Sequence, residues 1–298
     1  MTIANVSNQI VKYLSPPPAA AKAKNSCRQI FLFILVLIAA IGISWPAFAS
    51  DEHPIEQSPE QPGEQLPGKL VLVAGATGGT GHEVVRELLA NGYRVRAFIR
   101  DEGKARASFG DDIEYAVGDV RESATIIAAL DGVDALISAV GAGRGEPGNG
   151  PELVDYGGVR NMAEAATGLQ QFVLVSSIGV THEDHALNKM FNNVLLWKFK
   201  GEEALRASGV PYTIVRPGGL LNEPGGQQAI ILSQGDDGTG TIPRADLARV
   251  CVAALGSVAA LNKTFEVTTG RLSSNDSLDA GFLALTADSG IVSTSGEQ

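Results

Sequence analysis

A glycine-rich turn between an apolar run and an amphipathic segment constrains this chain more than any other feature. Residues 70–74 form a short, wholly apolar run, which is typical of a buried parallel strand. The next seven residues read Gly-Ala-Thr-Gly-Gly-Thr-Gly, and apolar residues then recur at helical spacing over residues 84–89. Glycines in such a strand–turn–helix unit let the backbone approach a pyrophosphate, and the helix N-terminus offers unpaired N–H groups. The sequence therefore predicts a dinucleotide-binding turn over residues 75–81.

Further apolar runs follow the first, with helical patterns between them. Repeated strand–helix units of this kind give a parallel sheet with helices on both faces. We therefore predict an α/β fold, a doubly wound parallel sheet of the Rossmann type, as a single domain behind an N-terminal apolar segment. The strands are expected at residues 70–74, 93–99, 113–117, 135–140, 172–176 and 212–215, and a last short helix at residues 278–285.

The N-terminal part of the chain has the pattern of a targeting segment. Residues 1–50 hold four basic residues and no Asp or Glu, and residues 30–49 carry no charge at all. Twenty residues of helix are about enough to cross the hydrocarbon core, and Ala47-Phe48-Ala49 is a small-x-small cleavage pattern. Both a cleaved export signal and a retained anchor fit, and the long, acid-free stretch before the run also resembles an organelle transit segment.

These patterns predict a membrane-associated protein held by an N-terminal anchor, or an exported one (periplasm or lumen) if the leader is cleaved after Ala49. Basic residues precede the apolar run and acidic residues follow it, which favours placing the domain on the far side of the membrane. The predicted divisions are a basic extension (1–29), a signal or transmembrane segment (30–49), a Pro/Glu/Gln-rich linker (50–68), the dinucleotide-binding domain (69–271) and a partly disordered tail (272–298).

Charge and cysteine content exclude several classes of partner. The chain has 33 acidic and 23 basic residues; after subtraction of the four N-terminal bases, residues 51–298 carry 33 against 19, a net charge of −14. Such a surface repels phosphate backbones, so no nucleic-acid partner is expected. Two cysteines exclude a cysteine-based zinc cluster. His182 and His185 stand in a polar loop without a third ligand at suitable spacing, so no metal site is predicted.

The end of the second predicted strand bears on the choice of cofactor. An acidic residue at this place accepts from the ribose 2′-hydroxyl of NAD, whereas an arginine suits the 2′-phosphate of NADP. Here the strand ends in Ile99-Arg100-Asp101, with Lys104 shortly after. Arg100 is therefore predicted to hold the 2′-phosphate, which favours NADP over NAD. The alternatives are a solvated arginine at a strand end, and a role for Asp101 that would favour NAD.

Most of the predicted domain resembles a known family. The segments 75–81, 100–101, 118–120, 172–179 and 210–219 are similar to the atypical short-chain dehydrogenase/reductases with an NAD(P)H-binding domain, the group of the NmrA-like and biliverdin-reductase-B-like proteins. The resemblance implies that the cofactor pyrophosphate is contacted by Gly75, Thr77, Gly78, Gly79, Thr80 and Gly81, and the adenine by Asp119 and Val120. It also implies that the Ala139-Val140-Gly141 turn contacts the ribose and that Pro217, Gly218 and Gly219 contact the nicotinamide.

The same resemblance implies where catalytic residues would stand. Classical members use a Tyr-x-x-x-Lys pair with a nearby Ser, in which Tyr exchanges the proton and Lys binds the nicotinamide ribose. Ser176 and Ser177 end the fifth strand, where that Ser belongs, and Lys198 matches the Lys. Four residues before Lys198 stands Val194, so the tyrosine is absent at that register. Tyr156 is either a substitute acid or a packing residue.

Two functions fit these residues. The first is an NADPH-dependent reductase of a small conjugated or aromatic acceptor, since such acceptors can take a proton from solvent. The alternative is a non-catalytic NADP(H)-binding redox sensor or assembly factor at a membrane, with a protein partner and with residues 30–49 retained as anchor. A sugar-nucleotide epimerase or dehydratase fits less well, because it would need the tyrosine and a larger substrate domain than the chain after Gly219 provides.

Overall fold

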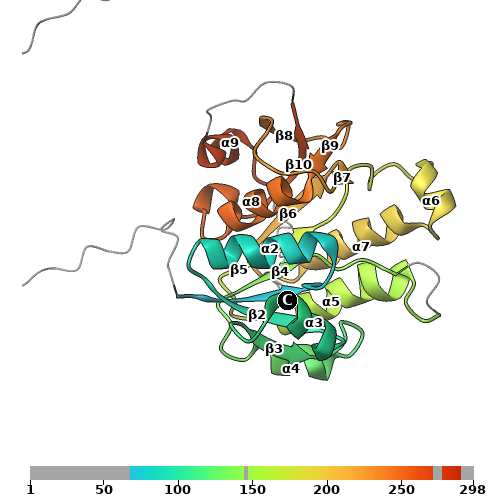
Figure 1. Ribbon diagram of the computed structural model, residues 1–298. Helices are drawn as coiled ribbons and strands as arrows, with labels where there is room; N and C mark the ends of the chain where they lie inside the picture. Colours follow the sequence, from blue (N-terminus) through green and yellow to red (C-terminus); the bar gives the residue numbers. More distant parts are fainter. Residues whose placement is uncertain (1–67, 144–146, 271–276, 290–298) are drawn as a thin grey trace, which may run out of the picture. The chain divides into compact units, whose positions relative to one another are not determined.

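A mostly parallel sheet forms the centre of the protein. The computed structural model describes residues 68–143, 147–270 and 277–289, and within these ranges it contains an eight-stranded sheet in the order β3-β2-β1-β4-β5-β6-β10-β8 (Figure 1). Every neighbouring pair in this sheet is parallel except β10 and β8. The strands are β1 (Leu70–Ala74), β2 (Arg94–Ile99), β3 (Glu114–Val117), β4 (Ala135–Ser138), β5 (Gln171–Val175), β6 (Tyr212–Pro217), β8 (Ile230–Ser233) and β10 (Lys263–Thr269).

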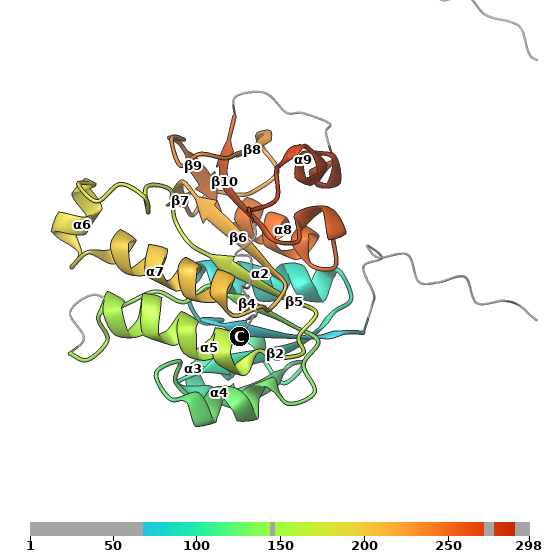
Figure 2. The same ribbon diagram turned by 180° about the vertical axis from the view of Figure 1, so that it is seen from behind.

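Helices cover both faces of the sheet, because alternate residues of the buried strands point to opposite sides. Val71 and Val73 pack with residues of α2, α3, α8 and α9, whereas Leu72 and Ala74 pack with residues of α4, α5 and α7. Figures 1 and 2 show these two layers from opposite sides. The helices are α2 (Gly79–Ala90), α3 (Glu102–Phe109), α4 (Ser123–Leu130), η1 (Glu152–Gly158), α5 (Val159–Ala165), α6 (Ala186–Met190), α7 (Val194–Ala207), α8 (Arg244–Ala254), η2 (Val258–Ala260) and α9 (Leu278–Ala284).

The predicted doubly wound α/β fold is confirmed, and the six predicted strands correspond to β1 to β6. The last helix is also present as α9, where Phe282 is buried against Phe265 with 5.6 Å between the ring centroids. The strands that follow β6 were not predicted from the sequence. They include a small second sheet, in which β7 (Gly219–Leu221) pairs in parallel with β9 (Thr241–Pro243).

The topology determines where a ligand can bind. The chain runs outward from β1 to β2 and β3, and then returns to place β4 on the other side of β1. The loops after β1 and β4 therefore diverge at the carboxyl edge of the sheet. Such a switch point is where ligands of open α/β sheets bind.

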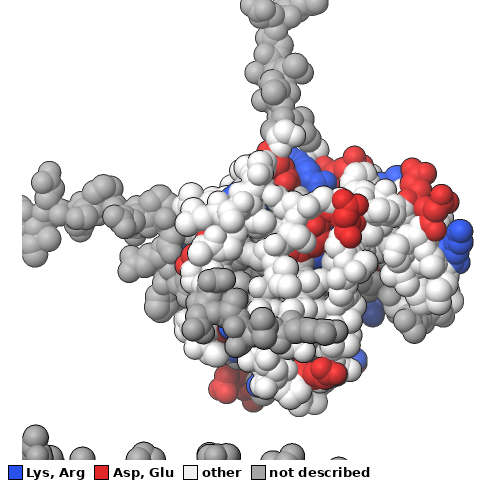
Figure 3. All heavy atoms as spheres, turned by 90° about the horizontal axis from the view of Figure 1, so that it is seen from above, with Lys and Arg blue, Asp and Glu red and all other residues white. Residues whose placement is uncertain are grey.

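The predicted extension, the apolar segment and nearly all of the linker (residues 1–67) lie outside the described residues. Among the residues that the structure describes, no helix has the length and apolar character needed to span a bilayer. On the face of the described domain seen from above, acidic side chains cover more of the surface than basic ones, in agreement with the acidic composition (Figure 3).

Candidate functional site

The glycine-rich turn has the geometry expected of a phosphate-binding loop. Gly75 leaves β1 with φ of +79°, a conformation that favours glycine, and its carbonyl accepts from the Gly78 N–H at 2.9 Å. A Cβ at Gly75 would lie 2.8 Å from the carbonyl oxygen of Ala139, so glycine also lets the turn lie against the loop after β4. Gly78 caps α2, whose first turn holds no acidic residue. The N-terminus of α2 is thus suited to an anion.

A pocket of about 270 Å³ opens beside this turn, at the carboxyl ends of β1 to β4. It brings together nine of the predicted cofactor residues from four separate loops: Gly75, Thr77, Gly78, Arg100, Asp119, Val120, Ala139, Val140 and Gly141. Lys104, on α3, also lines it. The carboxylate of Asp101 does not line it; it caps α3 by accepting from the Lys104 N–H at 3.0 Å. Of the two side chains that could distinguish NADP from NAD, that of Arg100 thus lines the pocket, whereas that of Asp101 caps α3.

Asp119 is held by Arg121 at the other side of this pocket. The guanidinium of Arg121 makes two contacts with the Asp119 carboxylate, Nε to Oδ1 at 2.8 Å and Nη2 to Oδ2 at 2.6 Å. These hydrogen bonds lower the pKa of Asp119, and the positive charge of Arg100 contributes in the same direction. Asp119 therefore stays ionised, and its orientation is set by the fork of Arg121.

The other predicted cofactor residues lie outside the lining of this pocket. Gly79 borders the side chain of Arg244, Thr80 is 8% exposed and Gly81 is buried inside α2. Pro217 ends β6. The N–H groups of Gly218 and Gly219 are occupied, because they donate to Val267 and Gly240 at 3.0 and 2.9 Å. These two glycines join the small sheet to β10, and their backbone donors serve the fold.

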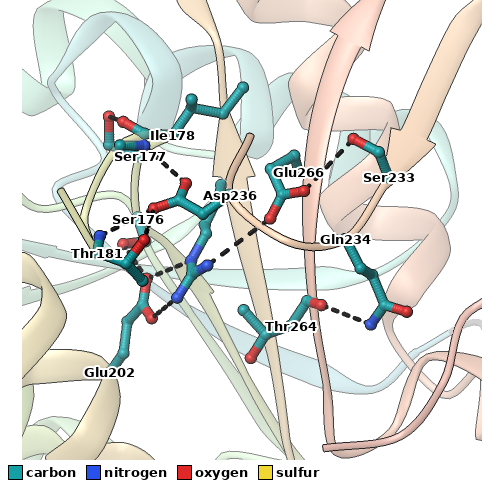
Figure 4. Close-up of polar contacts among 12 residues, drawn as sticks. Ser176, Ser177, Ile178, Thr181, Glu202, Ser233, Gln234, Asp236, Thr264 and Glu266 are labelled. Atoms are coloured by element: carbon teal, nitrogen blue, oxygen red, sulfur yellow. Dashed lines mark hydrogen bonds and ion pairs between the residues drawn. The ribbon is translucent and has the colours of Figure 1, made fainter. Parts of the chain in front are cut away.

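The two serines at the end of β5 have different surroundings. Ser176 is buried, and its hydroxyl contacts Glu202 Oε1 at 2.5 Å (Figure 4). Ser177 is half-buried and donates to the carbonyl of Ile178 at 3.0 Å. The Glu202 carboxylate also accepts hydrogen bonds from Nε and Nη2 of Arg216 at 3.0 and 2.7 Å. The Ser176 hydroxyl thus belongs to a buried ionic cluster.

Two more acidic residues of this cluster come from the C-terminal part of the chain (Figure 4). Asp236 accepts from the N–H groups of Gly179 and Thr181 at 2.7 and 2.8 Å, which ties the loop after β5 to the segment after β8. Glu266 lies 3.7 Å from Arg216 Nη1, and burial raises the pKa of its carboxyl group. Sequence reasoning missed both residues, because neither stands in a recognisable motif.

Lys198 contacts an acidic residue, Asp155, that was not among the predicted site residues. Its ammonium lies 2.8 Å from Oδ1 of Asp155, whose side chain is completely buried. Val194 is the first residue of α7 and lies one turn before Lys198. Tyr156 stacks on Trp197 with 6.0 Å between the ring centroids, as the packing alternative predicts. Asp155 could have been noticed only as an acidic residue among apolar and glycine neighbours.

The two loop histidines make local contacts. His182 Nε2 lies 3.1 Å from the carbonyl oxygen of Asp236, and His185 Nδ1 accepts from the Leu187 N–H at 3.2 Å. Within residues 68–143, 147–270 and 277–289, no group of three potential metal ligands is present.

The comparison with protein families agrees with this geometry. A family described as NAD(P)H-binding matches residues 75–257, which hold the glycine-rich turn, the pocket and all of the buried ionic cluster except Glu266. The chain belongs to this NAD(P)H-binding family. Its cofactor is accordingly a nicotinamide dinucleotide, and the predicted resemblance to the atypical short-chain dehydrogenase/reductases is confirmed.

Curated relatives include an oxidoreductase. Sanguinarine reductase of Eschscholzia californica is 34% identical over 66% of this chain and 88% of its own length. An uncharacterised chloroplastic protein of Arabidopsis thaliana is 39% identical over 62% of this chain and 65% of its own length. Protein TIC 62 of Pisum sativum, also chloroplastic, is 40% identical over 51% of this chain, but the match spans only 33% of that protein.

Solved structures share the fold. A Bacillus halodurans protein described as a candidate NAD-dependent epimerase/dehydratase superposes with a TM-score of 0.63 at 28% identity, covering 73% of this chain and all of that one. ChuY, an anaerobilin reductase of Escherichia coli O157:H7, superposes with a TM-score of 0.59 at 24% identity, covering 69% of this chain and all of that one. The architecture is thus that of NAD(P)-binding Rossmann proteins.

Proposed function

We propose that the protein is an NADPH-dependent reductase of a small conjugated or aromatic acceptor. The observation that carries this proposal is the pocket after β1 to β4, where the phosphate-binding turn faces Arg100 and Lys104. The similarity to sanguinarine reductase, which extends over 88% of that protein, supports a reductase.

The charges around the pocket support NADP as the cofactor. Arg100 and Lys104 both line it and would pair with a 2′-phosphate, and an arginine at the end of the second strand is the usual adaptation to that group. The acidic residue that would favour NAD, Asp101, already caps α3. We therefore expect NADPH to bind more tightly than NADH.

The residues near the nicotinamide half support a simple mechanism. NADPH supplies a hydride when bound. Lys198 would hold the nicotinamide ribose, and Ser177, the more accessible of the two serines, would orient the acceptor. The position one turn before Lys198 holds Val194, which cannot exchange a proton. The acceptor would thus gain a hydride on carbon and a proton from solvent on its heteroatom, which suits conjugated acceptors with a stabilised anion.

A titration of the full-length protein tests the cofactor. We expect NADPH to bind at least tenfold more tightly than NADH, because the binding free energy of one charge-assisted hydrogen-bond pair corresponds to about that ratio of affinities. Arg100→Ala should abolish this preference. Arg94→Ala is the matched control, because Arg94 lies at the opposite end of β2 and pairs with Glu114. Equal affinities of the wild type for NADPH and NADH would contradict the proposal for the cofactor.

Turnover separates the reductase from its alternative, a non-catalytic NADP(H)-binding sensor or assembly factor at a membrane. The second function is supported by the similarity to TIC 62, whose name does not describe an enzyme. NADPH oxidation should accelerate when quinones, flavins or conjugated imines are added to the protein. NADPH binding without acceleration by any acceptor would favour the sensor, and absence of binding would refute both.

Targeting to an organelle is a further proposal. Relatives named as chloroplastic support a transit role for the acid-free extension at residues 1–29. Reporter fusions at residue 60, assayed on both sides of the membrane, would show where the domain lies and whether residues 30–49 are retained. A reporter recovered only in the soluble cytosolic fraction would contradict both the anchor and the organelle.

A further inference from the structure

A buried carboxylate that none of the predicted roles uses lies beside Lys198. Asp155 belongs to η1, the π-helical segment that leads into α5. Its side chain is 0% exposed, whereas that of Lys198 is 18% exposed, and the two charged groups are 2.8 Å apart. A buried charge is costly unless it is paired, so the ion pair with Lys198 offsets the burial of the Asp155 carboxylate.

The same carboxylate also holds a loop of the cofactor pocket. Its second oxygen, Oδ2, accepts from the backbone N–H of Ala142 at 3.0 Å. Ala142 lies two residues after Val140, which lines the pocket at the end of β4. One side chain therefore connects α7, which carries Lys198, with the loop that would contact the cofactor ribose.

Two glycines make this arrangement possible by close packing. A Cβ at Gly201, one turn after Lys198 on α7, would lie 2.5 Å from the carbonyl oxygen of Asp155. A Cβ at Gly158, at the end of η1, would lie 2.6 Å from Val120 of the pocket. Because side chains at these places would force the elements apart, the distance between Lys198 and Asp155 is set by the backbone packing.

We propose that Asp155 is a positioning residue for the nicotinamide half of the cofactor: it orients the Lys198 ammonium and the loop after β4 together. The proposal rests on the proposed NADPH-binding function. An ammonium has three N–H donors, and the contact with Asp155 engages one side of it. The remaining donors are available to ribose hydroxyls, and the fixed partner removes the rotational freedom that Lys198 would otherwise lose on binding.

The test measures two ligands on the full-length protein. NADPH contains the nicotinamide ribose, whereas adenosine 2′,5′-bisphosphate keeps the adenosine and its 2′-phosphate but lacks that half. Asp155→Asn should weaken NADPH binding by about tenfold or more, as expected for loss of a charge-assisted contact. Its affinity for adenosine 2′,5′-bisphosphate should stay within about twofold of the wild type.

A double-mutant cycle tests whether Asp155 acts through Lys198. We expect Asp155→Asn combined with Lys198→Met to bind NADPH no more weakly than Lys198→Met alone. The asparagine amide oxygen can still accept from the Ala142 N–H, and no ammonium is left to orient. Glu152→Gln is the matched control: it removes the same charge from the same element at an exposed position, and it should leave both affinities unchanged.

Four results would overturn the proposal. Equal weakening of both ligands in Asp155→Asn would show a general structural role. Additive losses in the double variant would show that Asp155 acts independently of Lys198, and unchanged NADPH affinity in Asp155→Asn would show no role at all. A wild type that binds adenosine 2′,5′-bisphosphate but not NADPH would refute it too, whereas a wild type that binds neither would refute the proposed function itself.

Discussion

Replacing Arg216 with methionine is the sharpest test of how the buried ionic cluster stabilises the fold. The Arg216 side chain is 7% exposed and lies between the carboxylates of Glu202 and Glu266, which are 0% and 1% exposed. It donates to both oxygens of Glu202 and lies 3.7 Å from Glu266. Methionine fills a similar volume but offers neither donors nor charge, so two buried carboxyl groups lose their common partner.

The magnitude follows from what remains around Glu202. Removal of one partner of a buried ion pair typically costs about 3–5 kcal/mol. Glu202 retains the contact with Ser176 at 2.5 Å and that with Arg206 at 2.9 Å, so its charge is still partly compensated. We therefore expect Arg216→Met to lower the free energy of unfolding by about 3 kcal/mol, the lower end of that range.

Urea unfolding followed by circular dichroism measures this difference by linear extrapolation. Arg86→Met is the matched control, because Arg86 is 65% exposed and pairs with Glu83 at 3.0 Å on the surface of α2. The control should change the free energy of unfolding by no more than about 0.5 kcal/mol. A loss below about 1 kcal/mol for Arg216→Met, or one equal to the control, would refute the argument that this cluster is a stabilising network.

Two further substitutions test the burial and the packing. Burial raises the pKa of Glu266 in the folded protein. Its protonated carboxyl group therefore favours the folded state at pH values below its ordinary pKa, and this stability is lost as the pH rises through the folded-state pKa. Glu266→Gln should therefore gain in melting temperature over the wild type as the pH is raised, and a difference independent of pH would contradict this. Gly201→Ala should lower the free energy of unfolding by about 1–3 kcal/mol, since its Cβ would meet the Asp155 carbonyl. Gly103→Ala, at an exposed position of α3, should instead be neutral or stabilising by up to about 1 kcal/mol. Chemical denaturation measures the free energy of unfolding of both variants, and equal changes in the two would show that close packing at Gly201 is unimportant.

The central strands β1 and β4, whose ends border the candidate cofactor pocket, were predictable because they are short, mostly apolar runs. Val71 and Leu72 face opposite helical layers, so both must be apolar, and the run is visible without any partner. The strands after β6 were not predictable in this way. In β8 the burial alternates and Ile231 is 46% exposed, so its short pattern is easily mistaken for a loop.

The candidate site divides along the same line. The turn over residues 75–81 and the position of Arg100 follow from local spacing, because a strand, a tight turn and a helix are contiguous in the chain. The partners of Ser176 and Lys198 did not follow. Ser176 contacts Glu202 across 26 residues and Lys198 contacts Asp155 from a different helix, and side-chain type alone does not reveal which acid faces which base.

The sequence by itself determined the class of fold, the positions of its first six strands along the chain, the glycine-rich turn after β1 and the basic residues that we propose to bind the 2′-phosphate of NADP. These are local properties, since periodicity and glycine spacing act over a few neighbouring residues. Only the tertiary structure decided that Asp155 holds Lys198, that Arg216 joins Glu202 to Glu266, and that Asp236 ties the loop after β5 to the C-terminal segment. Those contacts depend on how helices and strands distant in the chain pack, and the glycines at 158 and 201 set the packing distances on which the Asp155 contact relies.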